Sequence, residues 1–346
     1  MLKQFQTALT FDDVLLVPQY SDIQHRSNVD ISAKLHKNLV LDIPFISANM
    51  DTVTESKMAI AMAKLGGLGI IHRFLTIQEE IREVEKVKKK KLKVGAAIGV
   101  KSGELERAKA LIKIGVDVIS LDIAHAHSKM AGDMLGALRK MTRIPIIAGT
   151  VATADGVEFL CKKGADIIKV GIGAGSACIT RLVSGTGVPQ ITAIMESAKA
   201  ARKYKIPIVA DAGMKIPADV VKAIGAGAHA IMSGNIFAGC DETPGKIIII
   251  NGKKYKPYRG MASLAANLQR TDKTVERKNY VAEGVNGLIS YKGSVQSVIT
   301  EFSGGLRSGL SYSGAHNILE FHKKAKFVQV TPTGLKENGS HDMQIR

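Results

Sequence analysis

Residues 144–170 read IPIIAGTVATADGVEFLCKKGADIIKV, and this stretch decides the fold. It begins with an apolar, β-branched segment at 144–148, continues with apolar residues at helical spacing over 154–163, and ends with a second apolar segment at 166–170. Two short apolar segments separated by one amphipathic helix are typical of a βαβ unit, in which the two strands run parallel. Because the same alternation continues on both sides, this unit is one part of a larger repeat.

The repeat contains eight apolar segments. They cover residues 43–47, 68–71, 94–98, 116–121, 144–148, 166–170, 206–210 and 228–232, and residues at helical spacing lie between them at 77–90, 104–114, 154–163, 193–203 and 218–226. This pattern predicts an α/β protein in which eight parallel strands close into a (β/α)8 TIM barrel. An open doubly wound sheet is the alternative. It would normally carry a glycine-rich phosphate-binding turn after its first strand, and the residues that follow 43–47 do not form one.

We expect a single barrel domain over residues 1–346, with additions after the eighth strand. Residues 247–255, IIIINGKKY, predict a hairpin with an Asn-Gly turn. A flap over the barrel mouth is expected at about 262–282, mobile because its polar stretch from 267 to 279 leaves little to bury. The polar C-terminal tail, about 331–346, is expected to become ordered against a neighbouring subunit.

Composition and charge exclude several classes of protein. The chain has 45% hydrophobic residues and a net charge of +17, which excludes collagen-like and mainly disordered chains. With no bilayer-length apolar run and no secretory pattern at the N-terminus, we expect a cytoplasmic protein that binds no membrane. The three cysteines are too few and too widely spaced for a disulfide framework or a zinc knuckle. The lysines at 86–93 are interpreted as the solvated end of a helix. Because aromatic residues that could stack on bases are few, the positive charge does not require a nucleic-acid partner.

Polar and glycine-rich residues follow most of the predicted strands, at 49–51, 72–73, 122–125, 171–180, 211–213 and 234–235. In a (β/α)8 barrel these positions share one rim, where active sites are built. For two features of this rim, the sequence allows both a structural and a functional interpretation. His125 is either a satisfied rim histidine or a site residue, and the pair His72 and Arg73 either forms strand-end ion pairs or takes part in the site.

The most informative rim segment is residues 171–181, GIGAGSACITR. Its glycines can present N–H groups to an anion, and Ser176 can donate to a phosphate. Cys178 lies among these donors, where a thiol is activated as a nucleophile. From these residues alone, a phosphate-binding loop with an incidental cysteine is an equal alternative.

This loop, followed by GVPQ at 187–190, resembles the catalytic loop of the IMP dehydrogenase and GMP reductase family. The resemblance covers essentially the whole chain. It includes LTFDDVLL at 9–16, NMDTV at 49–53, ADAG at 210–213, YRGM at 258–261, EG at 283–284 and GGLRS at 304–308. Several separate motifs in the same order make the resemblance specific. It implies a short form of the family, without the CBS modules that most IMP dehydrogenases carry after the second barrel helix.

The resemblance also implies an NAD(P)-dependent oxidoreductase that acts at C2 of a purine nucleotide monophosphate, GMP or IMP. Cys178 would attack C2 to form a covalent adduct, and Thr180 is the second candidate catalytic residue. The nucleotide would be held by Ser176, Asp211, Gly213, Gly234, Asn235, Tyr258, Gly260, Met261, Glu283 and Gly284. The NADPH or NAD molecule would contact Asp122, Gly171 and Gly173.

Two further properties follow from the resemblance alone. The carbonyls of Gly173, Gly175 and Cys178 would hold K⁺ or another monovalent cation. Family members are usually homotetramers, so we expect a homotetramer here. Within the nucleotide site, Asp211 would accept hydrogen bonds from the ribose hydroxyls, a role that suits a carboxylate placed directly after a barrel strand.

Two reactions fit the resemblance. GMP reductases convert GMP and NADPH to IMP, ammonia and NADP, whereas IMP dehydrogenases convert IMP, NAD and water to XMP and NADH. We expect GMP reductase, because the CBS insertion is absent and because Asn49 and Ile123 are similar to the residues that reductases place near the ligands. The flap also carries Arg-Thr at 270–271, where dehydrogenases use an Arg-Tyr pair to activate water.

IMP dehydrogenase is the alternative. Leu264 occupies the position at which reductases carry a Glu that helps to expel ammonia. Segments 9–18, 188–192 and 241–245 and the tail at 334–342 are also more similar to dehydrogenases. Because each reaction lacks one expected catalytic group, a nucleotide-binding paralogue without turnover is a third alternative, although the complete loop around Cys178 argues against it.

Overall fold

The computed structural model describes residues 6–272 and 280–339. Its centre is a closed barrel of parallel strands in the order β10–β11–β4–β5–β6–β7–β8–β9. The strands are β4 (Phe45–Ser47), β5 (Leu68–Ile71), β6 (Gly95–Ile98), β7 (Val118–Asp122), β8 (Ile146–Val151), β9 (Ile167–Val170), β10 (Ile208–Asp211) and β11 (Ala230–Ser233). Each overlaps one of the eight apolar segments, so the prediction of a (β/α)8 barrel is confirmed.

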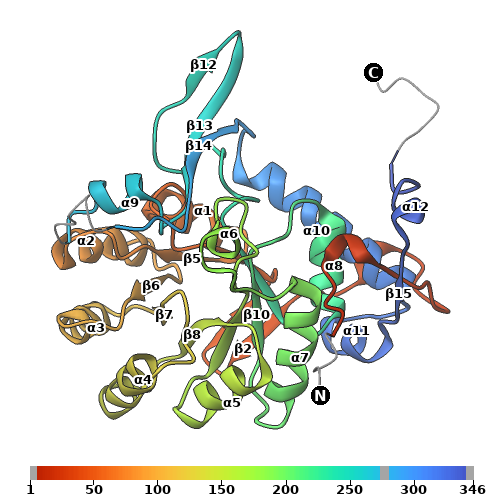
Figure 1. The fold of residues 1–346 in the computed structure, drawn as a ribbon, viewed down its shortest axis with the longest axis horizontal. Coiled ribbons are helices and arrows are strands. Elements are labelled where there is room, and N and C mark those ends of the chain that lie inside the picture. The colour runs from red at the N-terminus through yellow and green to blue at the C-terminus, as the bar shows by residue number, and fades with distance from the viewer. Residues whose placement is uncertain (1–5, 273–279, 340–346) are drawn as a thin grey trace.

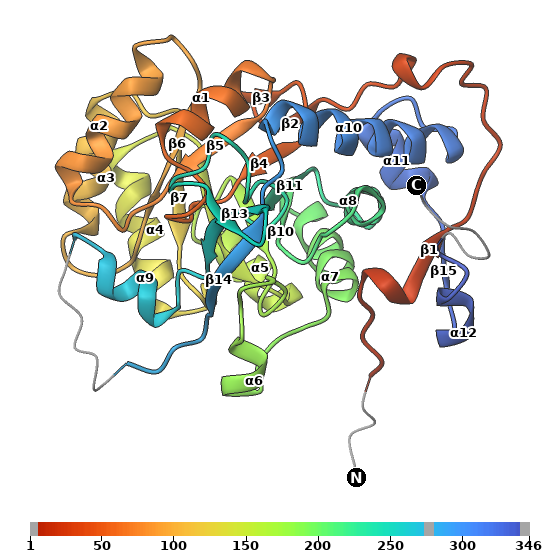
Figure 2. The same cartoon turned by 90° about the horizontal axis from the view of Figure 1, so that it is seen from above.

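Helices surround the barrel. They are α1 (Ser56–Lys64), α2 (Ile77–Lys88), α3 (Glu104–Lys113), α4 (Lys129–Met141), α5 (Ala154–Lys162), α7 (Gln190–Arg202), α8 (Pro217–Gly225) and α10 (Val295–Tyr312). Figure 1 shows α2, α3 and α4 on one side of the strands and α7, α8 and α10 on the other, and Figure 2 shows the same arrangement from above. The five helices predicted from spacing correspond to α2, α3, α5, α7 and α8.

Small residues set how closely the layers approach one another. A Cβ atom on Gly69 would lie 2.5 Å from the Cα atom of Ala59, so α1 packs directly on β5. A Cβ atom on Gly95 would lie 2.3 Å from the Cδ1 atom of Ile70, inside the barrel wall. Larger side chains at these positions would push the neighbouring elements apart. The glycines therefore allow α1 to pack closely on β5 and the side chain of Ile70 to pack closely on β6.

Shorter elements lie outside the barrel. The N-terminal part holds η1 (Phe11–Asp13), β1 (Val14–Leu16), η2 (Arg26–Asn28) and the hairpin of β2 (Ala33–His36) and β3 (Leu39–Leu41). The C-terminal part holds α11 (Ile318–Lys324), β15 (Phe327–Gln329) and α12 (Pro332–Leu335). Strand β1 pairs antiparallel with β15, so segments from the two ends of the chain lie side by side.

A three-stranded antiparallel sheet projects beyond the barrel (Figure 1). It consists of β12 (Ile248–Ile250), β13 (Lys253–Arg259) and β14 (Asn286–Ser290). The predicted hairpin is present, because β12 and β13 are joined at Asn251 and Gly252. These two residues have φ values of 49° and 74°, the positive values that a tight hairpin turn requires.

The flap differs from the expectation of a mobile polar stretch with little to bury. Its first part forms α9 (Leu264–Gln269), in which Asn267 is buried, and Arg270 and Asp272 after the helix are also nearly inaccessible. The expectation that little is left to bury was wrong for Asn267, Arg270 and Asp272, whose side chains are buried in contact with other polar groups, whereas Leu268, Gln269 and Thr271 are exposed. The mobility of the flap stays a prediction. The remainder of the predicted flap at 273–279 lies outside the described residues.

Two other predictions from charge can be compared with the structure. Helix α2 ends at Lys88, which pairs with Asp117 at 2.7 Å, and the exposed lysines that follow it match the interpretation of a solvated helix end. Residues 89–94 lead directly from α2 into β6.

Part of the C-terminal tail forms α12, and residues 340–346 lie outside the described ranges. None of the helices in the described ranges has the length and apolar character that crossing a membrane requires.

Candidate active site

A cavity of about 410 Å³ lies at the carboxyl ends of the barrel strands. Every residue that the sequence assigned to the site lines it: Cys178, Thr180, Ser176, Asp211, Gly213, Gly234, Asn235, Tyr258, Gly260, Met261, Glu283, Gly284, Asp122, Gly171, Gly173 and Gly175. The cavity is therefore built from the carboxyl ends of β7, β9, β10 and β11 and the loops after them, together with β13 and the segment before β14, and the loops after β4 and β5 add further lining. The fold brings these residues together, and their individual roles stay predictions.

The loop after β9 places Cys178 beside two other polar side chains. The Sγ atom of Cys178 lies 3.2 Å from the Oγ1 atom of Thr180, and the Thr180 hydroxyl donates to the Oε2 atom of Glu283 at 2.8 Å. The backbone fixes this arrangement, because the Ile179 amide donates to the Glu283 carbonyl at 2.9 Å. A thiol, a hydroxyl and a carboxylate therefore form one continuous chain of hydrogen bonds at the cavity wall.

Glycine is needed where other segments approach this loop. A Cβ atom on Gly260 would lie 2.6 Å from the Ala177 carbonyl oxygen, and one on Gly284 would lie 3.2 Å from the same atom. The loop that carries Cys178 therefore packs against bare backbone on that side. The short bridge between Cys178 and Gly284 holds the two segments in register.

Another part of the cavity offers hydrogen-bond donors in positions that suit a phosphate. The Ser176 hydroxyl lies 3.4 Å from the Tyr258 hydroxyl, and burial raises the pKa of Tyr258, so its O–H is retained as a donor. The turn after β11 exposes Gly234 and Asn235 to the cavity. Lys292 supports this turn, because its Nζ atom donates to the carbonyl oxygens of Asn235 at 2.6 Å and of Ile236 at 3.0 Å.

Lys169, which was not among the predicted site residues, lines the cavity from β9. Its side chain is 4% exposed, and its Nζ atom lies 2.7 Å from the Oδ1 atom of Asp122 and 3.0 Å from the Oδ2 atom of Asp211. The buried Lys169 charge keeps the pKa of Asp122 below its usual range, with help from Arg73. The available signal was a charged residue inside the otherwise apolar segment 166–170.

The alternatives left open for the rim histidines can now be distinguished. Arg73 lines the cavity, whereas the buried His72 does not and instead lies 3.6 Å from the carboxylate of Glu55. His125 also lies outside the cavity lining, with its ring centroid 6.2 Å from that of His127 in an edge-to-face contact. Of these candidates, the geometry places Arg73 at the site.

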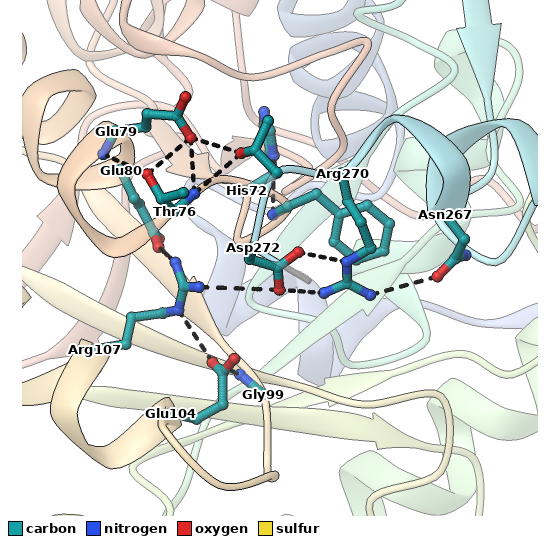
Figure 3. Close-up of polar contacts among 12 residues, drawn as sticks. His72, Thr76, Glu79, Glu80, Gly99, Glu104, Arg107, Asn267, Arg270 and Asp272 are labelled. Carbon is teal, nitrogen blue, oxygen red and sulfur yellow. Dashed lines mark hydrogen bonds and ion pairs between the residues drawn. The ribbon is translucent and has the colours of Figure 1, made fainter. Parts of the chain in front are cut away.

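The start of the flap contacts α3 through Asp272 and Arg107 and α2 through Thr271 and Glu79 (Figure 3). Arg270 contacts Asp272 through both carboxylate oxygens, and its guanidinium carbon lies 3.9 Å from the ring centroid of Phe74. Asp272 also faces Arg107 at 4.0 Å, and Arg107 pairs in turn with the buried Glu80. Burial raises the pKa of Glu80 to about 8, although Arg107 opposes the shift.

Comparison with known proteins agrees with this geometry. A family model described as the IMP dehydrogenase / GMP reductase domain matches residues 8–341. The chain belongs to the IMP dehydrogenase and GMP reductase family. This family consists of NAD(P)-dependent oxidoreductases, so the prediction of an enzyme of this class is confirmed.

Similar proteins carry both names found in this family. The IMP dehydrogenase of Cryptosporidium parvum is 41% identical, with 99% of this chain and 97% of that protein covered. The GMP reductase of Leishmania major is 34% identical, with 97% of each covered. A crystal structure of a GMP reductase variant from Trypanosoma brucei in complex with guanosine 5′-monophosphate has a TM-score of 0.91 and 32% identity, covering 98% of this chain and 99% of that chain.

The residues on the Asp122 side of the cavity fit the dinucleotide that the family uses. Phe74, Ile123 and Ala124 supply an apolar surface, and Asp122 and Arg73 supply one charge of each sign. A pocket with a mainly apolar wall and few polar groups is typical of sites that hold a planar ring and orient a sugar.

The fit to a monovalent cation is only partial. The expected ligands Gly173, Gly175 and Cys178 belong to one turn, and the Gly175 carbonyl already accepts the Cys178 amide at 3.0 Å. One turn supplies part of a coordination shell, so further ligands would have to come from elsewhere. We therefore assign the cation no step in the chemistry below.

Proposed function

We propose that this protein is a GMP reductase, which converts GMP, NADPH and a proton to IMP, ammonia and NADP⁺. The observation that carries the proposal is the hydrogen-bonded chain from Cys178 through Thr180 to Glu283. It supplies a nucleophile together with an acid–base group, so Glu283 can take the role that Leu264 cannot. Leu264 starts α9 and does not line the cavity.

We propose that the nucleotide lies across the cavity with its phosphate near Ser176 and Tyr258. Backbone N–H groups of Gly213, Gly234 and Asn235 would complete the phosphate site. Asp211 would accept from the ribose hydroxyls through its exposed edge, since its Oδ2 atom is held by Lys169. Met261, Gly260 and Gly284 would contact the base, which brings C2 to Cys178.

The proton and the electron pairs balance in this scheme. As Cys178 sulfur bonds to C2, the thiol proton passes through the Thr180 hydroxyl to the Glu283 carboxylate. Glu283 then returns that proton by the same route to the departing amine, so the C2–N bond breaks and ammonia leaves with the sulfur still on C2. NADPH, held beside Asp122, would supply a hydride for C2, and the C–S bond would break as C2 receives it. The sulfur leaves with the bonding pair as a thiolate, and uptake of the one proton in the overall reaction regenerates the Cys178 thiol.

Contacts of the flap favour the reductase. Water activation by a flap arginine needs a guanidinium that is free to interact with water, but Arg270 is held by both oxygens of Asp272 and stacked on Phe74. Thr271, next to it, donates instead to Glu79 at 2.6 Å. Tyr280 reaches the cavity, but its hydroxyl is engaged with Asn267 and with the Ala262 carbonyl.

IMP dehydrogenase is the second candidate, favoured by the higher identity to the Cryptosporidium parvum protein than to the Leishmania major reductase. In that reaction the same Thr180 and Glu283 pair would deprotonate the water that hydrolyses the adduct. A nucleotide-binding protein without turnover is the third candidate. The intact chain of Cys178, Thr180 and Glu283 argues against it, because binding alone requires no thiol at this position.

Two parallel assays test the proposal. The purified protein is given GMP with NADPH, and separately IMP with NAD, each with potassium chloride and with sodium chloride. Loss of NADPH absorbance with stoichiometric ammonia supports the reductase. Formation of NADH with XMP establishes the dehydrogenase instead, and binding of nucleotide with neither product supports the third candidate. A rate that depends on potassium supports the cation site at Gly173, Gly175 and Cys178.

From the resemblance we also propose a single-domain cytoplasmic homotetramer without CBS modules. Residues 89–94 run from α2 into β6, which leaves no room for a module at that junction. The alignment to the IMP dehydrogenase of Nitrosopumilus maritimus spans 474 positions against 346 residues here, so at least 474 − 346 = 128 positions have no counterpart in this chain. Light scattering at assay concentration measures the mass of the assembly.

A further inference from the structure

The barrel strands contain three charged residues, and one of them, Lys169, contacts the other two. Asp122 ends β7, Lys169 lies in β9 and Asp211 ends β10. The Nζ atom of Lys169 is 2.7 Å from Asp122 and 3.0 Å from Asp211. Strands β9 and β10 are neighbours, but β8 separates β9 from β7, so the lysine connects positions that the sheet itself keeps apart.

The shared ammonium group leaves both carboxylates available to the cavity. The side chain of Lys169 is 4% exposed, whereas those of Asp122 and Asp211 are 23% and 18% exposed. One oxygen atom of each carboxylate is thereby fixed in place, and the rest of the group still lines the cavity. A buried ammonium group that pairs with two carboxylates fixes their positions, whereas carboxylates that were only hydrated would be mobile.

We propose that Lys169 is a positioning residue that couples the two halves of the cavity, the half at Asp211 that takes the nucleotide and the half at Asp122 that takes the dinucleotide. The identity of these ligands rests on the proposed function, but the coupling does not depend on the direction of the reaction. When ribose hydroxyls donate hydrogen bonds to Asp211, its negative charge is partly stabilised by them, and its ion pair with the Lys169 ammonium group weakens. Lys169 then moves toward Asp122, which changes the position and the charge of the Asp122 carboxylate at the dinucleotide site.

The two carboxylates depend on Lys169 to different extents. Asp122 also faces Arg73 and accepts a hydrogen bond from Asn49, and its pKa is below the usual range. Burial and the nearby Asp122 charge raise the pKa of Asp211, and Lys169 is the cation that opposes this. Tyr258 is a further titratable group near Asp211, and Cys178 lies near Tyr258. Loss of Lys169 should therefore affect nucleotide binding more than dinucleotide binding.

The test measures a coupling factor by calorimetry. The dissociation constant of GMP is determined with and without saturating NADP⁺, a pair that supplies no hydride and therefore cannot complete a turnover. In the wild type we expect the ratio to differ from one by at least about fivefold, the lower end of measured coupling between sites. In Lys169→Met we expect a ratio within about twofold of one. Equal ratios in the two proteins, or no coupling in the wild type, would overturn the inference.

Lys222 offers a matched control. It is also a buried lysine, but its Nζ atom donates to the Phe11 carbonyl at 2.9 Å, outside the cavity lining. Lys222→Met should lower the melting temperature and leave the coupling factor unchanged. A change as large as that in Lys169→Met would show that general loosening of the fold moves the ratio, and would contradict the proposal.

A second variant covers the case in which Lys169→Met does not fold. Asp122→Asn keeps the lysine and removes one of its two partners. Because Lys169 then serves Asp211 alone, GMP affinity without dinucleotide should change by at least about threefold, most strongly at low pH, where Asp211 is closest to protonation. An unchanged affinity across the pH range contradicts the proposal.

The outcomes also separate this inference from the proposed function. A wild type that binds GMP and NADP⁺ with coupling but releases no ammonia refutes the reductase and leaves the role of Lys169 standing. A wild type that releases ammonia while Lys169→Met retains full coupling refutes the role of Lys169 alone.

Discussion

Replacing Glu283 by Gln tests the proton route with little change in shape. The Thr180 hydroxyl donates to Glu283 at 2.8 Å, and the amide oxygen of the introduced glutamine would still accept this bond. The amide cannot hold a proton, so the thiol proton has no place to go and the amine receives none. General acid–base groups contribute about 100- to 10,000-fold to a rate. Since a tenfold change in rate is worth about 1.36 kcal/mol, we expect the barrier to rise by roughly 2.7 to 5.4 kcal/mol.

The assay follows NADPH absorbance at saturating GMP, together with ammonia release and GMP affinity by calorimetry. We expect kcat to fall by the factor above while the GMP dissociation constant stays within about threefold, because Glu283→Gln removes proton transfer and keeps the contact. Thr180→Val should cause a loss of similar size, and Thr180→Ser, which keeps the hydroxyl, should retain most activity. The double variant of Glu283→Gln and Thr180→Val should lose little more than either single one, as residues of one route act as a unit.

Two results would refute this reasoning. A Glu283→Gln enzyme with kcat within threefold of the wild type would show that another acid serves the amine. Additive losses in the double variant would show that Thr180 and Glu283 act in separate steps.

Three further predictions follow from the site and its surroundings. Cys178→Ala should abolish turnover and leave GMP binding measurable by calorimetry, whereas activity near that of the wild type would remove the covalent mechanism. Asp211→Ala should weaken GMP binding, since a hydrogen bond to a charged group is worth about 1.5–3 kcal/mol, and an unchanged dissociation constant would mean that the ribose lies elsewhere. The pKa of Glu80 is raised from 4.5 to about 8, so the folded state binds this proton more tightly than the unfolded chain does. Its stabilising contribution is full below about pH 4.5 and is lost as pH rises toward about 8, by at most about 1.4 kcal/mol per pH unit. Urea unfolding at about pH 5.5 and pH 8 should show this fall in the wild type and a smaller one in Glu80→Gln, and equal falls would contradict the assignment.

The barrel and the outline of its site were predictable from local pattern. Each apolar run, such as residues 144–148 or 166–170, predicts a buried strand by itself, because a parallel strand in a barrel is buried on both faces. Polar residues directly after such runs, such as Asp211, lie on one rim once the strands close. The close approach of residues 260 and 284 to the loop around Cys178 was not derivable from spacing, and the resemblance supplied those residues.

The parts that local pattern missed depend on contacts between distant segments. Lys169 is one charged residue within an apolar run, and its meaning depends on Asp122 and Asp211 in other strands. The start of the flap is polar in sequence, so a solvated loop was the natural prediction. Its charges are buried because Arg270 finds Asp272 nearby in sequence and Phe74 in another loop. A pattern of residue types carries no information about which distant charge neutralises which.

The ion pair between Arg270 and Asp272 helps to distinguish a reductase from a dehydrogenase. A guanidinium stays cationic in proteins, so one held by a bidentate carboxylate and an aromatic ring contributes attachment rather than proton transfer. Arg270 and Asp272 fix the start of the flap against Arg107 of α3, at the side of the cavity next to Arg73 and Phe74. In the proposed mechanism, a lining segment fixed in this way would limit the access of water to the adduct. Exclusion of water suits a reaction in which hydride must reach C2 before water does. In a dehydrogenase, by contrast, the adduct must be opened to water, and Arg270 would first have to leave Asp272.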